Sequence, residues 1–235
     1  MQHISIGTSM ELANTQQGYG PARERFISKT FNHLGGAILA FTAIEVILFK
    51  SGMAEVMAQA MRHLPWFLIL GAFMLIGWLA SRAAHTVESL PLQYAALGAY
   101  VIAEAIIFVP MLYIANQVAP GAIATAGLVT VLATVGLVGV AYVSKKDFSF
   151  LGAILKWCGL VALVLIACGM IFGFQLGLLF SVAMVAVAGA SILYDASNII
   201  HHYPEDRYVG ASLELFASVA LLFWYVLRIV MKLRD

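Results

Sequence analysis

The sequence is short of charge. Only 12 acidic and 13 basic residues occur in 235, so charged residues make up 11% of the chain, whereas hydrophobic residues make up 62%. Soluble proteins carry about 25% charged and about 45–50% apolar residues. So few charges cannot cover a globule of this size in water, which excludes a soluble enzyme and a disordered chain. The net charge of +1 also excludes a nucleic-acid binder, which needs a basic face. We therefore expect a chain that is solvated mostly by a lipid bilayer.

Cysteines and catalytic motifs are scarce as well. Cys158 and Cys168 are the only two cysteines, and on a helix they would lie about 15 Å apart along the axis, too far for a disulfide. The sequence contains no His-Glu-x-x-His zinc helix, no Gly-x-Ser-x-Gly nucleophile motif and no glycine-rich phosphate loop. We therefore expect no catalytic activity and no resident cofactor, with the calcium ion considered below as the exception.

Long apolar runs dominate what remains. Each is close to the about 20 residues that a helix needs to cross the hydrocarbon core, and none shows the alternation of a membrane β-barrel. The sequence therefore predicts an all-α fold with seven transmembrane helices. These segments are Phe31–Phe49, Pro65–Ser81, Leu92–Asn116, Gly121–Val143, Phe150–Ile171, Phe174–Ile200 and Val209–Met231.

The segment before the first apolar run is polar. We expect residues 1–30 to form a flexible cytosolic tail and residues 31–235 to form the transmembrane domain. Lys and Arg are more frequent in loops on the cytosolic side of a membrane. With the N-terminus in the cytosol, seven basic residues fall inside and five outside, so we expect the N-terminus inside. The inside set is Arg23, Arg25, Lys29, Arg82, Lys145, Lys146 and Arg207; the outside set is Lys50, Arg62, Arg228, Lys232 and Arg234.

A few polar residues fall inside the predicted spans, where charges are costly and usually face the bundle interior. By depth, Asp195, Glu214 and Arg82 belong to one layer near the cytosolic side, and Ser218 follows Glu214 by one turn on the same face. Glu104 lies near the middle of the third span. Two carboxylates in one layer cannot both ionise cheaply, so they could bind a divalent cation such as Ca²⁺ or act as a proton-operated latch. The alternative is a structural ion pair with Arg82.

Three stretches resemble a known family. They are Ile192-Leu-Tyr-Asp-Ala-Ser-Asn-Ile-Ile-His201, Ser212-Leu-Glu-Leu-Phe-Ala-Ser-Val-Ala-Leu-Leu-Phe223 and Lys145-Lys-Asp-Phe-Ser-Phe-Leu-Gly152. Their order and sequence are similar to those of the Bax inhibitor-1 family, and Ser197 to His201 resembles its bacterial YccA branch.

The resemblance implies a fold in which helices one to six surround a central seventh helix. In several members an aspartate on each of the last two helices forms a pH-sensitive latch on a calcium leak path. Asp195 matches the first aspartate, but Ser218 stands at the second position, so the pair is incomplete. Glu214 could reach the same layer by our own inference, and Arg82 resembles the arginine that partners the latch.

Two functions follow as expectations. The YccA branch is associated with the membrane AAA protease FtsH as a slow substrate and inhibitor, and a polar cytosolic tail suits a protease that grips an extended end. The first expectation is therefore a modulator of FtsH in the bacterial inner membrane. The alternative is a pH-sensitive calcium or cation leak that uses Asp195, Glu214 and Glu104.

Overall fold

The computed structural model describes residues 19–62, 64, 66–86, 89–174 and 176–234. Within this part of the chain all regular structure is helical, which confirms the all-α class. The helices are α2 (Pro21–Lys50), α3 (Met53–Arg62), α4 (Trp66–Thr86), α5 (Leu90–Val118), α6 (Ala122–Ser144), α7 (Leu151–Phe172), α8 (Leu178–His201) and α9 (Tyr208–Arg234).

Six of these helices are long and apolar enough to cross a membrane: α2, α5, α6, α7, α8 and α9. The chain is therefore a multi-pass membrane protein, as the composition predicts. The second predicted span lies on α4, which is not among these six, so the exact number of seven spans stays a prediction. Helix α2 begins at Pro21, ahead of the predicted span that starts at Phe31.

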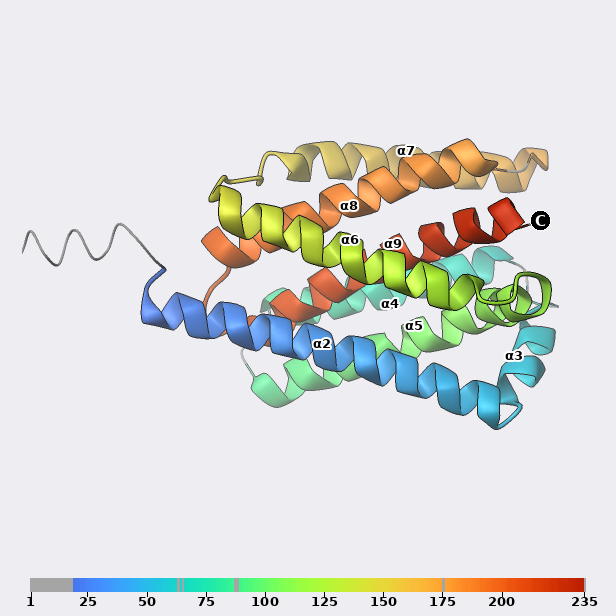
Figure 1. Cartoon of the computed structure of the whole chain (residues 1–235), viewed down its shortest axis with the longest axis horizontal. Helices are drawn as coiled ribbons and strands as arrows, with labels where there is room; N and C mark the ends of the chain where they lie inside the picture. The colour runs from blue at the N-terminus through green and yellow to red at the C-terminus, as the bar shows by residue number, and fades with distance from the viewer. Residues whose placement is uncertain (1–18, 63, 65, 87–88, 175, 235) are drawn as a thin grey trace, which may run out of the picture.

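Helix α9 lies in the middle of the bundle. It packs against α2, α4, α5, α6 and α8, and Figure 1 shows it running between these helices. Its side chains are buried on several sides, with Leu215 and Leu227 fully enclosed. In the described part of the chain α7 packs against α8 but not against α9, so it lies outside the group that surrounds α9.

The outside of the bundle is apolar. On α7, Trp157 is 70% exposed and Ile171 is 75% exposed, and Leu179 on α8 is 84% exposed. A soluble monomer rarely leaves contiguous apolar patches in water, whereas lipid tails are as apolar as these side chains. The exposed surface therefore suits a bilayer.

One feature of the chain was not predicted. The short helix α3 was missed because a search for spans of about 20 residues passes over a helix of 10. The break between α7 and α8, in contrast, was predicted between Ile171 and Phe174, although it is almost invisible in composition, and the structure has it between Phe172 and Leu178. Gly173 creates it by adopting the left-handed region at φ 73°, which favours glycine and ends α7.

Candidate functional site

A cavity of about 350 Å³ lies where α8 ends and α9 begins. This is the end of the bundle at which α2 also starts, and we call it the N-terminal end (Figure 1). The polar and titratable residues that line the cavity come from α4, α5, α8, α9 and the loop between α8 and α9. They are Ser81, Tyr100, Tyr194, Asp195, Asn198, Tyr203, Glu214 and Ser218.

Asp195 is only 8% exposed on the last turns of α8. The Ser218 hydroxyl of α9 donates a hydrogen bond of 2.5 Å to Asp195 Oδ2. Hydrogen bonds to an ionised carboxyl group are stronger than those between neutral groups. The pair therefore joins the two helices at the wall of the cavity.

Glu214 is half-buried one turn before Ser218 on α9. The Ser81 hydroxyl of α4 donates to Glu214 Oε1 at 3.3 Å, and the Tyr203 hydroxyl donates to Glu214 Oε2. Burial and the neighbouring Glu214 carboxyl raise the pKa of Tyr203, so the phenol keeps its proton and remains a donor. Glu214 thereby connects α9 to α4 and to the loop.

The loop that carries Tyr203 is held by α2. The Tyr203 ring stacks on Phe26 with the ring centroids 6.5 Å apart. Arg23 Nη1 donates to the Tyr203 carbonyl oxygen at 2.6 Å and to the Ile199 carbonyl oxygen at 3.4 Å, and Arg23 also lies 3.7 Å from the Glu205 carboxyl group. The guanidinium therefore satisfies carbonyl groups at the end of α8, as a cation near a helix C-terminus can.

A second set of contacts holds the loop between α6 and α7 against the same end of α8. His202 Nε2 lies 2.8 Å from Asp147 Oδ2, and the Phe148 backbone N–H donates to Ser197 Oγ at 2.8 Å. The Ser149 backbone N–H and then His202 lower the pKa of Asp147 to about 2. These contacts involve the stretch from Lys145 to Gly152 that carries part of the family resemblance, and they connect it to the helix that carries Asp195.

The structure brings together three of the five predicted site residues: Asp195, Glu214 and Ser218. Arg82 follows Ser81 on α4, but within the described residues its side chain does not line the cavity, and its guanidinium lies 5.4 Å from the Trp78 ring centroid. Glu104 is 2% exposed on α5 and hydrogen-bonded to Tyr100. It lines a separate, larger cavity.

Sequence reasoning found Ser218 but missed other uncharged members of the site. Ser81, Tyr100 and Tyr203 were passed over because, apart from Ser218, only charged groups inside the spans were considered. A weak signal existed for Tyr100, because it precedes Glu104 by four residues and therefore shares a helix face with it. Nothing in the sequence pairs Tyr203 with Glu214, because their contact depends on how the loop folds back.

Another buried acid lies apart from this cavity. Glu45 on α2 is 7% exposed, and neither of its carboxyl oxygens has a hydrogen-bond partner among the described residues. It lies five residues before the end of α2 at Lys50, and the structure encloses it between helices.

The described residues contain no group of three or more His, Cys, Asp and Glu side chains that could hold a metal ion. Ca²⁺ takes 6–8 oxygen ligands. Asp195 and Glu214 could therefore supply only part of a calcium shell, together with hydroxyl oxygens and water.

Comparisons with known proteins agree with the sequence resemblance. The model of a family described as "Inhibitor of apoptosis-promoting Bax1" matches residues 23–235, which is most of the chain. A curated relative, "Protein LIFEGUARD 4" of Arabidopsis thaliana, is 28% identical over 211 residues, covering 87% of this chain and 83% of the relative.

Proposed function

This chain belongs to the Bax inhibitor-1 family, and from that premise we propose that it is a pH-sensitive leak for Ca²⁺ or another cation, controlled at the cavity of Asp195 and Glu214. The observation that carries the proposal is that both acids line one cavity, each from a different helix. An intramembrane carboxyl group is costly and usually marks an ion or proton pathway.

The hydrogen bonds around the two acids support a closed state. Ser218 holds Asp195, while Ser81 and Tyr203 hold Glu214. Together they join α4, α8, α9 and the loop after α8 across the cavity. For a cation to pass, these hydrogen bonds must break. Each hydroxyl group then contacts the ion or a water molecule in place of the carboxyl group.

The sign of the pH effect follows from charge. When both carboxyl groups are ionised, they repel each other and attract cations. As the pH falls and the carboxyl groups take up protons, the cavity loses its attraction for cations, so cation flux decreases. Conduction needs binding that is favourable enough for entry and weak enough for exit, which a cavity with two carboxyl groups can provide.

Calcium flux into liposomes across a pH series tests this proposal. The full chain should carry Ca²⁺ faster at neutral than at acid pH. Asp195→Asn and Glu214→Gln should each reduce neutral-pH flux by roughly tenfold, the equivalent of about 1.4 kcal/mol of lost attraction for the ion. The matched control is Glu55→Gln, which removes one exposed acid on α3 and should leave the flux unchanged.

Flux equal to that of empty vesicles from acid to neutral pH would overturn the proposal. So would flux that is independent of pH, or that falls equally in the control. If Asp195→Asn only destabilises the protein and flux per folded molecule stays constant, the acid is a structural group.

A second candidate function is modulation of the membrane AAA protease FtsH, with this protein as a slow substrate and inhibitor. The polar N-terminal segment and the YccA-like Ser197–His201 sequence favour it. Residues 1–18 lie outside the described part of the structure. Because Arg23 and Phe26 hold the loop after α8, an N-terminal segment gripped by the protease without disturbing the fold must precede α2.

Deleting residues 2–18 tests the second candidate. The deletion should lengthen the lifetime of the protein in cells that contain FtsH and abolish its competition with other substrates. A scrambled segment of the same composition should behave like the native one, because a gripping protease needs an extended end rather than a particular sequence. Unchanged lifetime and competition after the deletion would contradict this role.

Both candidates share one cellular setting. We propose a bacterial inner membrane because of the YccA-like Ser197–His201 sequence, and a cytosolic N-terminus because of the distribution of Lys and Arg. The cavity of Asp195 and Glu214 then lies toward the cytosol, and the end of α9 lies on the outer side.

A further inference from the structure

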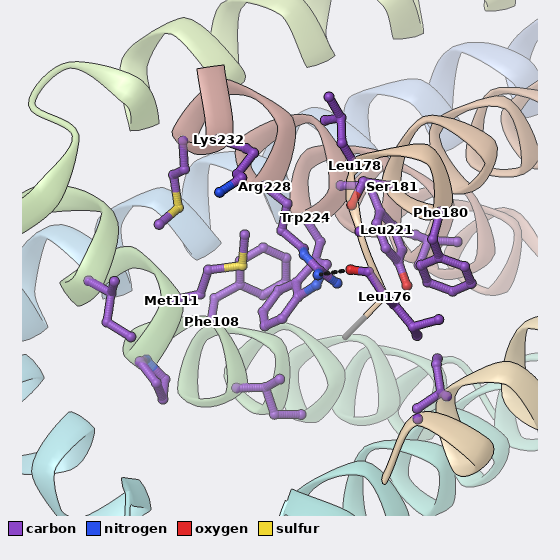
Figure 2. Close-up of a pocket in the computed structure, with 18 of the residues that line it drawn as sticks. Phe108, Met111, Leu176, Leu178, Phe180, Ser181, Leu221, Trp224, Arg228 and Lys232 are labelled. Atoms are coloured by element: carbon purple, nitrogen blue, oxygen red, sulfur yellow. Dashed lines mark hydrogen bonds between the residues drawn. The ribbon is translucent and has the colours of Figure 1, made fainter. Parts of the chain in front are cut away.

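A second and larger cavity forms a groove at the opposite end of the bundle, where α9 ends; we call this the C-terminal end. Its volume is about 790 Å³, within the range of about 300–1,000 Å³ that ligand sites occupy. It is lined by residues of α5, α7, α8 and α9 (Figure 2). In the described part of the chain α5 and α7 do not pack against each other, so the groove lies in the gap between them.

The walls of the groove are apolar over most of its length. Phe108 and Met111 come from α5, Met170 from α7, and Leu221 and Trp224 from α9. Figure 2 shows Phe108, Met111 and Trp224 side by side in the wall. Because the groove runs from Ala220 to Lys232 on α9, it is about 18 Å long at 1.5 Å per residue. That shape and chemistry suit a long hydrocarbon chain.

The mouth of the groove is positively charged. Arg228 and Lys232 are one turn apart on α9 and both line it. Arg228 Nη2 donates a hydrogen bond of 3.2 Å to the Leu176 carbonyl oxygen, which fixes the guanidinium at the mouth, as Figure 2 shows. An arginine has five N–H donors, so one such bond leaves capacity for an anion.

The acid of the groove lies at the other end. Glu104 is ten residues before Ile114 on α5, about 15 Å deeper along the helix axis. It is 2% exposed and hydrogen-bonded to Tyr100. The described lining residues include no other Asp or Glu, so the two cations at the mouth have no acidic partner there.

We propose that this groove binds one acyl chain of an anionic phospholipid from the surrounding bilayer, with the lipid phosphate held by Arg228 and Lys232. The apolar walls take the chain, and the cationic mouth selects the headgroup. A cationic amphiphile is repelled by the mouth. The site is separate from the cavity of Asp195 and Glu214, and its occupation does not depend on the proposed leak.

Quenching of Trp224 by brominated lipids tests the site, because bromine quenches only nearby indole rings. The protein carries Trp66, Trp78 and Trp157 as well, so all three are changed to Phe to leave Trp224 as the single reporter. The protein is reconstituted in phosphatidylcholine bilayers that contain increasing fractions of phosphatidylglycerol brominated along the acyl chain, or of phosphatidylcholine brominated in the same way.

Brominated phosphatidylglycerol should reach half-maximal quenching at a roughly tenfold lower mole fraction than brominated phosphatidylcholine, because each basic residue near the surface attracts anionic lipid. Arg228→Gln combined with Lys232→Gln should abolish this preference. Lys232→Gln alone should reduce the preference for phosphatidylglycerol. Because this side chain is exposed, the single variant should fold normally and keeps the test valid if the double variant misfolds. Lys50→Gln is the matched control, since Lys50 is a basic residue at the end of α2 outside the groove.

Equal quenching by the two lipids would overturn the proposal, as would a preference that survives in the double variant or falls equally in Lys50→Gln. Brominated free fatty acid added to phosphatidylcholine bilayers provides a further comparison. If it quenches Trp224 as effectively as phosphatidylglycerol does, the groove takes a single-chain carboxylate and the assignment to phospholipid is wrong.

Discussion

The hydrogen bond from Tyr203 to Glu214 gives the sharpest test of the site, because its strength depends on whether the carboxyl group is charged. Tyr203→Phe removes only the hydroxyl and keeps the ring that stacks on Phe26. Glu214→Gln removes the charge at nearly constant volume. Since each residue has further contacts, a double-mutant cycle is needed to isolate the term that belongs to this pair.

The expected coupling follows from the chemistry of the acceptor. A hydrogen bond to a charged group contributes about 1.5–3 kcal/mol, and one between neutral groups about 0.5–1.5 kcal/mol. Tyr203 is 7% exposed, so solvent weakens the bond little. At neutral pH we expect a coupling of about 1.5–3 kcal/mol, which should decrease by roughly half at acid pH, once Glu214 has taken up a proton.

The assay is the free energy of unfolding of the full chain in detergent or bilayer, measured for the four proteins of the cycle at both pH values. Tyr142→Phe is the control, because that side chain is 46% exposed and its loss should change stability little. A coupling below about 0.3 kcal/mol at neutral pH would refute the contact, since distant sites are additive to that level. If the coupling is the same at both pH values, the expectation that Glu214 takes up a proton between neutral and acid pH is wrong.

Two further predictions concern contacts that hold the site in place. At Gly152 an added Cβ would meet the Tyr194 ring at 2.9 Å, whereas at Gly159 on the same helix nothing lies within 4 Å. Gly152→Ala should therefore destabilise the protein by about 1–3 kcal/mol, while Gly159→Ala should be neutral or stabilising by up to about 1 kcal/mol. Thermal unfolding in detergent measures both effects. Asp147 should titrate with a pKa of about 2 in carboxyl ¹³C NMR, and His202→Ala should raise that pKa only in part, because the backbone N–H of Ser149 is the larger cause. Since this pKa is held below the ordinary value of about 3.9, the contribution of Asp147 to stability is present above about pH 4 and is lost as the pH falls toward 2; an unshifted titration would contradict the contact.

The sequence predicted the helices well because the signal was local. A run of about 20 apolar residues specifies a spanning helix without reference to any other part of the chain, and α5, α6 and α9 each lie within a few residues of the predicted bounds. The predicted layer of Asp195, Glu214 and Ser218 also rested on a local quantity, the depth of each residue along its own helix. These three do line one cavity.

The depth of a residue along its helix does not fix the direction in which its side chain points around the helix axis. Whether the other two predicted residues line the cavity depends on that direction. Arg82 has the expected depth, but among the described residues its side chain lies outside the cavity. Glu104 is buried, but it faces the larger groove. The direction of a side chain around the helix axis is set by how the helices pack. A single sequence with little amphipathic pattern does not reveal this packing, and α5, with apolar residues on all sides, is the clearest case.

By itself, then, the scarcity of charge determined that this protein is a helical membrane protein and reduced the candidates to a few intramembrane polar groups, because the cost of burying charge acts on each residue separately. Tertiary structure decided which groups meet. It placed the hydroxyl groups of Ser81, Tyr203 and Ser218 on the two acids, and it separated that cavity from the groove with a cationic mouth at the other end of the bundle. Those contacts join two different helices, or a helix and the loop after α8, so only the tertiary packing could create them.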